Sequence, residues 1–309
     1  MSQLKANISE LMVTIRCLVY NHEPYLRQCL DGFVMQKANF RFEAIVHDDA
    51  STDGSAAIIR EYAEKYPDII KPILETENQY SKKDGSLTRI MNAHTHGKYV
   101  ALCEGDDYWT DPLKLQKQVD FLESHPDYSL CWHRCRFYSQ NDGNYTVNYP
   151  KCGFESITAT EFLNGTTIPQ TLTLMYRRSS IDLNKYSSLR FNGDIVLYYM
   201  LLLQSKGHCM EDVMGVYRVH NQGVWSGANE EGRLLWDINA KSVIYNLNPS
   251  KEAAIYLCRM LDRNISRRYL VIHIRKLMPI YFIIYKHLGL LFLSKFLLNK
   301  YILRRKMIY

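Results

Sequence analysis

Short apolar runs alternate with amphipathic segments over the first 125 residues of the chain. Four runs rich in β-branched and other apolar residues have the length and composition typical of buried strands: 12–19, 42–46, 69–74 and 99–103. Each is followed by a segment whose apolar residues recur every three or four positions, as on one face of a helix, beginning near Pro24, Gly54, Leu87 and Pro112. Strand-helix alternation of this kind predicts a doubly wound, mostly parallel α/β sheet.

The pattern from residue 129 onward is less regular. It predicts a strand at 129–139, a short helix opened by the capping box Thr158-x-x-Glu161, a strand at 171–177, an apolar helix at 194–205 and a strand pair or loop at 210–219. No linker rich in Gly, Pro or Ser divides residues 1–230, so we expect one domain there. Residues 231–309 are expected to form a separate helical and basic extension.

Polar residues gather where three of the predicted strands end. Tyr20-Asn21 follows the first strand, Asp48-Asp49 the second and Glu104-Gly105-Asp106-Asp107 the fourth. Parallel strands present their carboxyl ends at one edge of a sheet, and open α/β sheets bind their ligands at that edge. Three carboxylates in the last group repel one another unless a cation lies among them, so this group indicates a Mg2+ or Mn2+ site shared with phosphate. The alternative is an acidic loop that caps the helix after it.

Charge is unevenly distributed along the 309 residues, which carry a net +6. Residues 263–309 contain eleven Lys or Arg and no Asp or Glu, so the rest of the chain is net negative. A nucleic-acid-binding protein would be expected to have its basic face on the main domain, and we therefore expect no nucleic-acid partner.

The cysteines and the N-terminus indicate the compartment. Eight cysteines occur without a C-x-x-C pair, several inside apolar runs, which is typical of buried thiols in a reducing cytoplasm. Cys131, His133 and Cys135 alternate along one predicted strand face, as either core residues or part of a zinc site. The first ten residues are polar and do not resemble a signal peptide, so we expect a cytoplasmic protein.

Taken together, the three polar groups resemble the motifs of the family 2 glycosyltransferases. Asp48-Asp49-Ala50-Ser51-Thr52-Asp53-Gly54 is similar to the D-D-x-S-x-D-G motif of that family, and Glu104-Gly105-Asp106-Asp107 resembles its D-x-D motif with Glu in the first place. The resemblance covers about residues 11–227. It implies the GT-A fold, a Rossmann-like doubly wound sheet, and inverting transfer of a sugar from a nucleotide donor, commonly a UDP-sugar, in the synthesis of cell-surface polysaccharides.

The resemblance also implies roles for single residues. Tyr20, with Asn21 beside it, would stack on the base of the donor, and Asp48 or Asp49, of which Asp49 is favoured, would accept a hydrogen bond from that base. A strand-end tyrosine and a turn-shaping pair are the plain alternatives. Arg89 would lie near the diphosphate, although its surroundings depart from the usual A-R-N pattern, and Glu104 would contact the ribose. Asp106 would bind the metal, and Asp107 would be either a second ligand or a support of the loop.

Two later segments complete the implied site. Asn192-Gly193-Asp194 resembles the position of the catalytic base, so Asp194 would deprotonate the acceptor hydroxyl, unless it is only a helix cap. Tyr217 to Ser226 resembles a segment that closes over the donor, in which His220 would contact metal or phosphate, unless it is a solvent-facing loop residue.

The C-terminal segment suggests a membrane surface. Residues 277–298 are apolar and near the length of a membrane span, but Lys286 and His287 fall in the middle. Three interpretations are open: helices lying on an anionic inner membrane surface, helices packed on the main domain or on a partner, and a helix spanning the bilayer. The first is favoured. A lipid-linked acceptor would explain such a tail.

Two other functions remain open. A sugar-1-phosphate nucleotidyltransferase also uses acidic metal ligands on an α/β sheet, but it typically has a glycine-rich loop after the first strand, and residues 19–27 contain no glycine. A non-catalytic sugar-nucleotide-binding protein would retain Tyr20 and the Asp pair but would not need Asp194.

Overall fold

The computed structural model describes residues 10–140, 143–146, 156–165, 169–189, 193–221, 223, 227–259, 282–283, 286 and 293. Two compact units share the chain. The first comprises Met1–Thr158, Thr167–Leu189 and Leu201–Asn221, and the second comprises Ala159–Thr166, Arg190–Met200 and Gln222–Tyr309. The chain therefore passes between the units several times.

One sheet organises the first unit. Its strand order is β3-β2-β1-β4-β9-β6-β10-β5, with β7 paired to β6 and β8 to β10. The strands are β1 (Leu11–Val19), β2 (Arg41–Asp48), β3 (Ile70–Leu74), β4 (Tyr99–Leu102), β5 (Tyr108–Trp109), β6 (Tyr128–Ser139), β7 (Tyr145–Thr146), β8 (Ser156–Ile157), β9 (Met175–Arg177) and β10 (Lys206–Val219). Strands β3, β2, β1 and β4 are parallel, whereas β9, β5, β7 and β8 each pair antiparallel with their neighbours.

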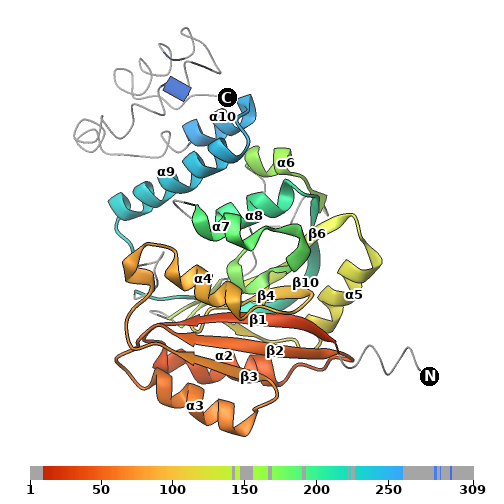
Figure 1. Cartoon of the computed structure of the whole chain (residues 1–309), viewed down its shortest axis with the longest axis vertical. Coiled ribbons are helices and arrows are strands. Elements are labelled where there is room, and N and C mark those ends of the chain that lie inside the picture. The colour runs from red at the N-terminus through yellow and green to blue at the C-terminus, as the bar shows by residue number, and fades with distance from the viewer. Residues whose placement is uncertain are drawn as a thin grey trace. The chain divides into compact units, whose positions relative to one another are not determined.

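Helices cover both faces of the parallel half of this sheet. The helices of the first unit are α2 (Glu23–Val34), α3 (Ser55–Lys65), α4 (Ser86–Ala93), α5 (Lys114–Ser124), which lies against β6, and α7 (Leu183–Ser188), which contacts α4. Short 3-10 turns are η1 (Tyr80–Lys82), η2 (Thr171–Thr173) and η3 (Arg178–Ser180). Figure 1 shows α2 and α3 on one side of strands β1 to β3 and α4 on the other. The first four predicted strands and the helices that follow them are confirmed, so the alternation in the sequence does encode a doubly wound sheet.

The core of the first unit lies between β1 and α2. Val13, Ile15 and Cys17 alternate along β1 and are fully buried against the apolar face of α2, which includes Leu26 and Leu30. Burying a side chain of this size contributes roughly 1.5–3 kcal/mol. Because β1 is central and covered, its carboxyl end is held in a fixed place.

A close backbone approach fixes the start of β4. Gly97 donates its N–H to the Thr14 hydroxyl oxygen at 2.9 Å. A Cβ atom at position 97 would lie 2.4 Å from the backbone nitrogen of Thr14, a contact that no side chain permits. Only glycine therefore allows β4 to enter the sheet beside β1.

Two expectations for the later segments need correction. The strand expected at 171–177 is wrong in its first half, because Thr171–Thr173 forms the η2 turn and only Met175–Arg177 is strand β9. The segment expected at 210–219 as a strand pair or loop is one strand, β10, which starts at Lys206. Its register with β6 shifts between Met210 and Val213, so Glu211 and Asp212 bulge out of the ladder without ending it.

The second unit is helical where it is described. It contains α6 (Ala159–Leu163), the start of α8 (Asp194–Leu202), α9 (Glu230–Leu247) and α10 (Lys251–Arg259). The Phe162 ring lies 5.9 Å from that of Tyr199 and 5.8 Å from that of Tyr256, which joins α6, α8 and α10. Lys241 of α9 is buried, 4.0 Å from Asp237 and over the Tyr256 ring, so its charge is compensated.

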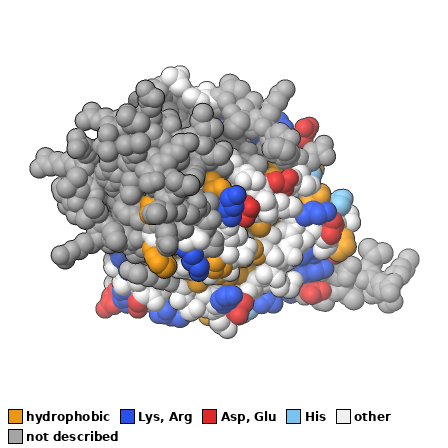
Figure 2. Space-filling model, turned by 90° about the horizontal axis from the view of Figure 1, so that it is seen from above, with side chains coloured by type: hydrophobic (Ala, Val, Ile, Leu, Met, Phe, Trp, Pro, Cys, Tyr) orange, Lys and Arg blue, Asp and Glu red, His pale blue; other side chains and the backbone are white. Residues whose placement is uncertain are grey.

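The basic C-terminal segment lies almost entirely outside the described residues, and so does its predicted membrane contact. Within the ranges that the structure describes, none of the helices is both long and apolar enough to cross a bilayer. Figure 2 shows cationic and anionic side chains intermixed over the described part of the face it presents.

Candidate functional site

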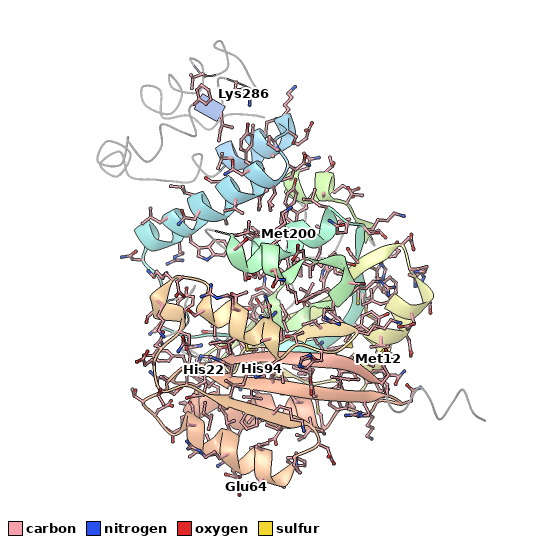
Figure 3. The ribbon with its side chains drawn as sticks, in the orientation of Figure 1. Met12, His22, Glu64, His94, Met200 and Lys286 are labelled. Carbon is pink, nitrogen blue, oxygen red and sulfur yellow. The ribbon has the colours of Figure 1, made fainter. Side chains whose placement is uncertain are left out.

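Three strands of the first unit deliver polar residues to one edge of the sheet. Val19 at the end of β1 pairs with Asp48 at the end of β2, and Arg16 pairs with Leu102 at the end of β4. The loops beyond stay anchored to β1, because Asp49 N–H donates to the Val19 carbonyl and Gly105 N–H to the Leu18 carbonyl, both at 2.9 Å. Figure 3 places His22 and Met12 at opposite ends of β1, with His22 at this polar edge.

Asn21 ties the loop after β1 to the loop after β2. Its backbone N–H donates to the Ser51 hydroxyl at 2.9 Å, and its side-chain oxygen accepts the Thr52 N–H at 2.8 Å. Asn21 is left-handed with φ +57°, a conformation that asparagine tolerates better than most residues. The side chain of Asn21 is thus engaged in shaping the edge.

The two carboxylates of the Asp48-Asp49 pair differ in their contacts. Asp49 accepts the backbone N–H groups of Gln79 at 2.6 Å and Tyr80 at 3.0 Å, one on each oxygen. Asp48 accepts the Ser51 N–H with Oδ2, and its Oδ1 is buried with no hydrogen-bond partner. Since buried polar atoms normally have partners, the orphaned Oδ1 of Asp48 is the free acceptor of this pair.

A second cluster forms where β10 ends beside the loop after β4. His220 Nε2 lies 2.9 Å from Asp106 Oδ2, and His22 Nε2 lies 3.8 Å from the same oxygen. Burial raises the pKa of Asp106, but the hydrogen bond from His220 and the charge of the two histidines outweigh it, so the pKa lies below its usual value. Burial lowers the pKa of His22. This carboxylate is therefore ionised at neutral pH beside two imidazoles.

Asp107 faces away from that cluster. Its side chain is 2 % exposed, and its Oδ1 accepts the backbone N–H of Arg218 at 2.8 Å. Burial, and next the charge of Asp106, hold the pKa of Asp107 well above its usual range. Asp106 and Asp107 are therefore neighbours in sequence with opposite surroundings.

The separation of Asp106 and His220 fits a divalent cation. Two ligands at right angles on a cation with ~2.1 Å bonds lie about 3 Å apart, close to the 2.9 Å between Oδ2 and Nε2. Among the described residues, no group of three His, Cys, Asp or Glu side chains is arranged to hold a metal ion. Cys131, His133 and Cys135 therefore do not form such a group either. A cation here would need further oxygen ligands from a bound molecule.

The remaining predicted residues lie apart from these two clusters or at their margin. Tyr20 follows β1 and is 47 % exposed, which leaves its ring open to stack on a ligand. Arg89 of α4 is exposed, donates to the Asp84 carbonyl at 2.7 Å and lies 3.7 Å from the Asp84 carboxylate. Glu104 is half-buried, and its carbonyl accepts the Asp107 N–H at 3.1 Å.

Asp194 belongs to the second unit. It begins α8, and its Oδ1 accepts the backbone N–H of Ile195 at 2.7 Å. The first unit thus brings together Tyr20, Asn21, Asp48 and Asp49 at one corner and Asp106 with His220 at another, whereas Asp194 is carried by a different part of the chain.

Sequence reasoning missed two residues of the second cluster, His22 and Arg218. Arg218 Nη1 donates to the Asp106 carbonyl at 2.6 Å, and its side chain also reaches Gln28 of α2. His22 directly follows the Tyr20-Asn21 motif, and Arg218 precedes His220 by two residues. Each missed residue is therefore a near neighbour in sequence of a predicted one. That spacing was the available signal.

Comparison with known proteins shows the family. The family described as glycosyl transferase family 2 matches residues 17–183. Uncharacterized protein Rv1520 of Mycobacterium tuberculosis is 36% identical over 228 residues, which are 73% of this chain and 64% of that protein. The chain therefore spans somewhat less than two thirds of that relative. TuaG of Bacillus subtilis, a glycosyltransferase assigned to teichuronic acid biosynthesis, is 25% identical over 229 residues, 73% of this chain and 86% of TuaG.

Solved structures show the same fold. Residues 1–349 of TarS from S. aureus in complex with UDP-GlcNAc give a TM-score of 0.63 at 18% identity, with 84% of this chain and 75% of that chain covered. The mannosyltransferase PcManGT from Pyrobaculum calidifontis, in complex with GDP-Man and Mn2+, gives 0.52 at 16% identity, with 98% and 94% covered. The sheet of the first unit is the GT-A sheet that the motifs implied. With a family match over more than half of its length, this chain belongs to glycosyltransferase family 2.

Proposed function

We propose that this chain is a metal-dependent, inverting glycosyltransferase that moves a sugar from a nucleoside-diphosphate donor to a hydroxyl group of a saccharide or lipid-linked acceptor. The observation that carries the proposal is the pairing of Asp106 with His220 beside the polar edge formed by β1, β2 and β4. A donor whose base lies at that edge would extend its diphosphate along it toward this pair.

The base of the donor would bind at the corner between β1 and β2. Tyr20 offers an exposed ring for stacking, and the unpartnered Oδ1 of Asp48 offers an acceptor for a base N–H. Asp49 has both oxygens engaged by the backbone of the η1 turn, which favours a supporting role. A uracil base is consistent with this arrangement, and TarS, which has the same fold, binds UDP-GlcNAc.

The cation would be held by Asp106 and His220, with its other ligands from the diphosphate. Bound there, Mg2+ or Mn2+ neutralises negative charge on the departing nucleoside diphosphate. Asp107 would support the loop instead of binding metal, because its Oδ1 already accepts the Arg218 N–H. Arg89 is exposed and its guanidinium contacts Asp84 at the start of its own helix, so we assign it no contact with the donor.

Asp194 would serve as the base. An acceptor hydroxyl attacks the anomeric carbon from the face opposite the leaving diphosphate, and it must lose its proton as the new bond forms. Asp194 places a carboxylate, a group that can accept a proton, in the first turn of α8. The role of TuaG in teichuronic acid biosynthesis supports cell-surface polysaccharide as the product class. The expected contact of the C-terminal segment with an anionic inner membrane surface is part of the same proposal.

The test is a screen of donors with and without metal. Thermal unfolding is recorded with UDP-, GDP- and dTDP-sugars, each with Mn2+, with Mg2+ and with EDTA. We expect one nucleotide class to raise Tm only when a divalent cation is present, by the equivalent of about 2.7 kcal/mol at a donor concentration of ~100 Kd. Equal stabilisation in EDTA would contradict the metal requirement. Formation of a sugar nucleotide from a nucleoside triphosphate and a sugar-1-phosphate would instead identify a nucleotidyltransferase.

The contacts of the Asp pair predict different effects of two substitutions. Asp49→Ala leaves the N–H groups of Gln79 and Tyr80 without acceptors, so we expect the free energy of unfolding to fall by roughly 1–3 kcal/mol in urea titrations. Asp48→Asn keeps an acceptor for Ser51 and should instead weaken nucleotide binding. Glu64→Ala, at an exposed carboxylate of α3, is the control and should change stability by less than about 0.5 kcal/mol. If Asp49→Ala is stable but no longer binds nucleotide, Asp49 is the residue that contacts the base and Asp48 has the supporting role.

A further inference from the structure

Arg218 is a buried cation at the edge of the proposed metal site. It lies on β10 two residues before His220, and the residue is 6 % exposed. Its guanidinium carbon lies 4.5 Å from the ring centroid of Tyr108 and 5.2 Å from that of Tyr25. His220 directly follows Val219, the last residue of β10, so a single residue separates it from Arg218 along the chain.

Both ends of Arg218 contact the loop that carries Asp106. Its backbone N–H donates to Asp107 Oδ1 at 2.8 Å, and its side-chain Nη1 donates to the Asp106 carbonyl at 2.6 Å. Nη2 donates to Gln28 Oε1, which connects the same group to α2. Three donors of one residue therefore span the loop, the strand and the helix.

We infer that Arg218 is a positioning residue for the metal site, which sets the separation of Asp106 from His220. One ligand, His220, is joined to Arg218 through Val219, the last residue of β10. The other, Asp106, is on a loop with no regular secondary structure of its own, and its carbonyl is attached to Arg218 by a charge-assisted hydrogen bond. Arg218 is thus connected to both proposed ligands, to His220 through the backbone and to Asp106 through its side chain. The 2.9 Å separation of His220 Nε2 from Asp106 Oδ2 therefore depends on Arg218.

Arginine is suited to this role in a way that lysine is not. A planar guanidinium can donate in two directions in one plane while its faces lie on aromatic rings, whereas an ammonium is a point donor. Arg218→Lys keeps the charge but should lose one of the two side-chain bonds. The loop would then sample positions in which Asp106 lies too far from His220 for a shared cation. Loss of a residue that orients a metal ligand typically weakens metal binding 10–100-fold.

Arg177 offers a matched control in the same sheet. It lies on β9, donates to the Tyr128 carbonyl and the Tyr99 hydroxyl, each at 2.8 Å, and its guanidinium carbon is 5.4 Å from the Tyr99 ring centroid. It thus joins backbone and aromatic groups as Arg218 does, but it contacts neither the Asp106 loop nor β10. Arg177→Lys should cost stability without changing the metal site.

The experiment compares the full chain with Arg218→Lys and Arg177→Lys. Binding of Mn2+ in the presence of UDP is measured from the electron paramagnetic resonance signal of free Mn2+. We expect Arg218→Lys to weaken Mn2+ binding 10–100-fold and Arg177→Lys to leave it unchanged. Transfer by Arg218→Lys should recover substantially at saturating Mn2+, which a general folding defect would not allow. Unchanged Mn2+ affinity in Arg218→Lys, or an equal loss in Arg177→Lys, would overturn the inference.

A second measurement needs no ligand and separates this inference from the proposed function on which it rests. Amide hydrogen exchange of the ligand-free protein should accelerate in the peptide covering residues 103–109 for Arg218→Lys only. If the unmodified protein binds no Mn2+, the metal part of the proposed function fails, and this measurement still decides whether Arg218 holds the loop. Equal exchange rates at 103–109 in all three proteins would show that it does not.

Discussion

Replacing Asp106 by alanine is expected to abolish metal-stimulated donor binding and to lower kcat/KM roughly 10²–10³-fold. The range is that typical for removal of one group that stabilises developing charge. Asp106 is the carboxylate that faces both His220 and His22, and its pKa lies below the usual value, so the alanine variant loses a negative charge at this position. Titrations of Mn2+ against donor binding and against transfer would measure the two losses.

Asp107→Asn is the matched control for that result. The asparagine oxygen can still accept the Arg218 N–H, and burial, which raises the pKa of Asp107, disfavours a charge at this position. We expect little change in the Mn2+ midpoint. A loss as large as that of Asp106→Ala would show that Asp107 is a metal ligand, the alternative that the sequence left open.

Asp194→Asn is expected to lower the rate of transfer by about 10²–10⁴-fold, the usual contribution of a general base, while donor binding stays nearly unchanged. Asparagine retains an oxygen that can accept the Ile195 N–H, so the start of α8 should be preserved. Single-turnover transfer and isothermal titration with the donor would separate the two quantities.

The helix-cap alternative has its own control. Asp182 is the N-cap of α7 and accepts the N–H groups of Asn184 and Lys185, both at 3.0 Å, with no proposed part in the reaction. Asp182→Asn should leave transfer unchanged. If Asp194→Asn transfers sugar at the unmodified rate as well, Asp194 is only a cap and the base is another residue.

The parallel half of the fold could be predicted from the sequence because its signals are local. β1 and β4 are apolar over nearly their full length, and α2 shows its buried face at helical spacing. β5 was missed because two residues, Tyr108 and Trp109, show no periodicity, and they become a strand only by pairing with β10. The sequence left 210–219 open as a strand pair or a loop, whereas Glu211 and Asp212 form a bulge within one strand, β10.

The candidate site was predictable as far as strand ends determine it. Tyr20, Asp48 and Asp106 follow strands that the sequence identifies, so their common edge could be expected. The different surroundings of Asp48 and Asp49 could not be predicted from the sequence, because Asp49 contacts the backbone of a turn some 30 residues later in the chain. Arg218 was missed for the same reason, since its contact with the Asp106 carbonyl joins residues 112 positions apart. Contacts of this range leave no periodic pattern.

The long reach between β10 and the loop after β4 has a consequence for synthesis. Asp106 and His220 are 114 positions apart, and Arg218 is 190 positions from Gln28. Closing such long segments costs chain entropy before any contact compensates for it, so these pairings form late in folding. Because the N-terminal part leaves the ribosome first, the corner with Tyr20 and Asp48 can assemble on a nascent chain while β10 is still missing. The proposed cation site would thus form after the proposed base-binding corner. An incomplete chain could bind the nucleotide but would not yet hold the cation.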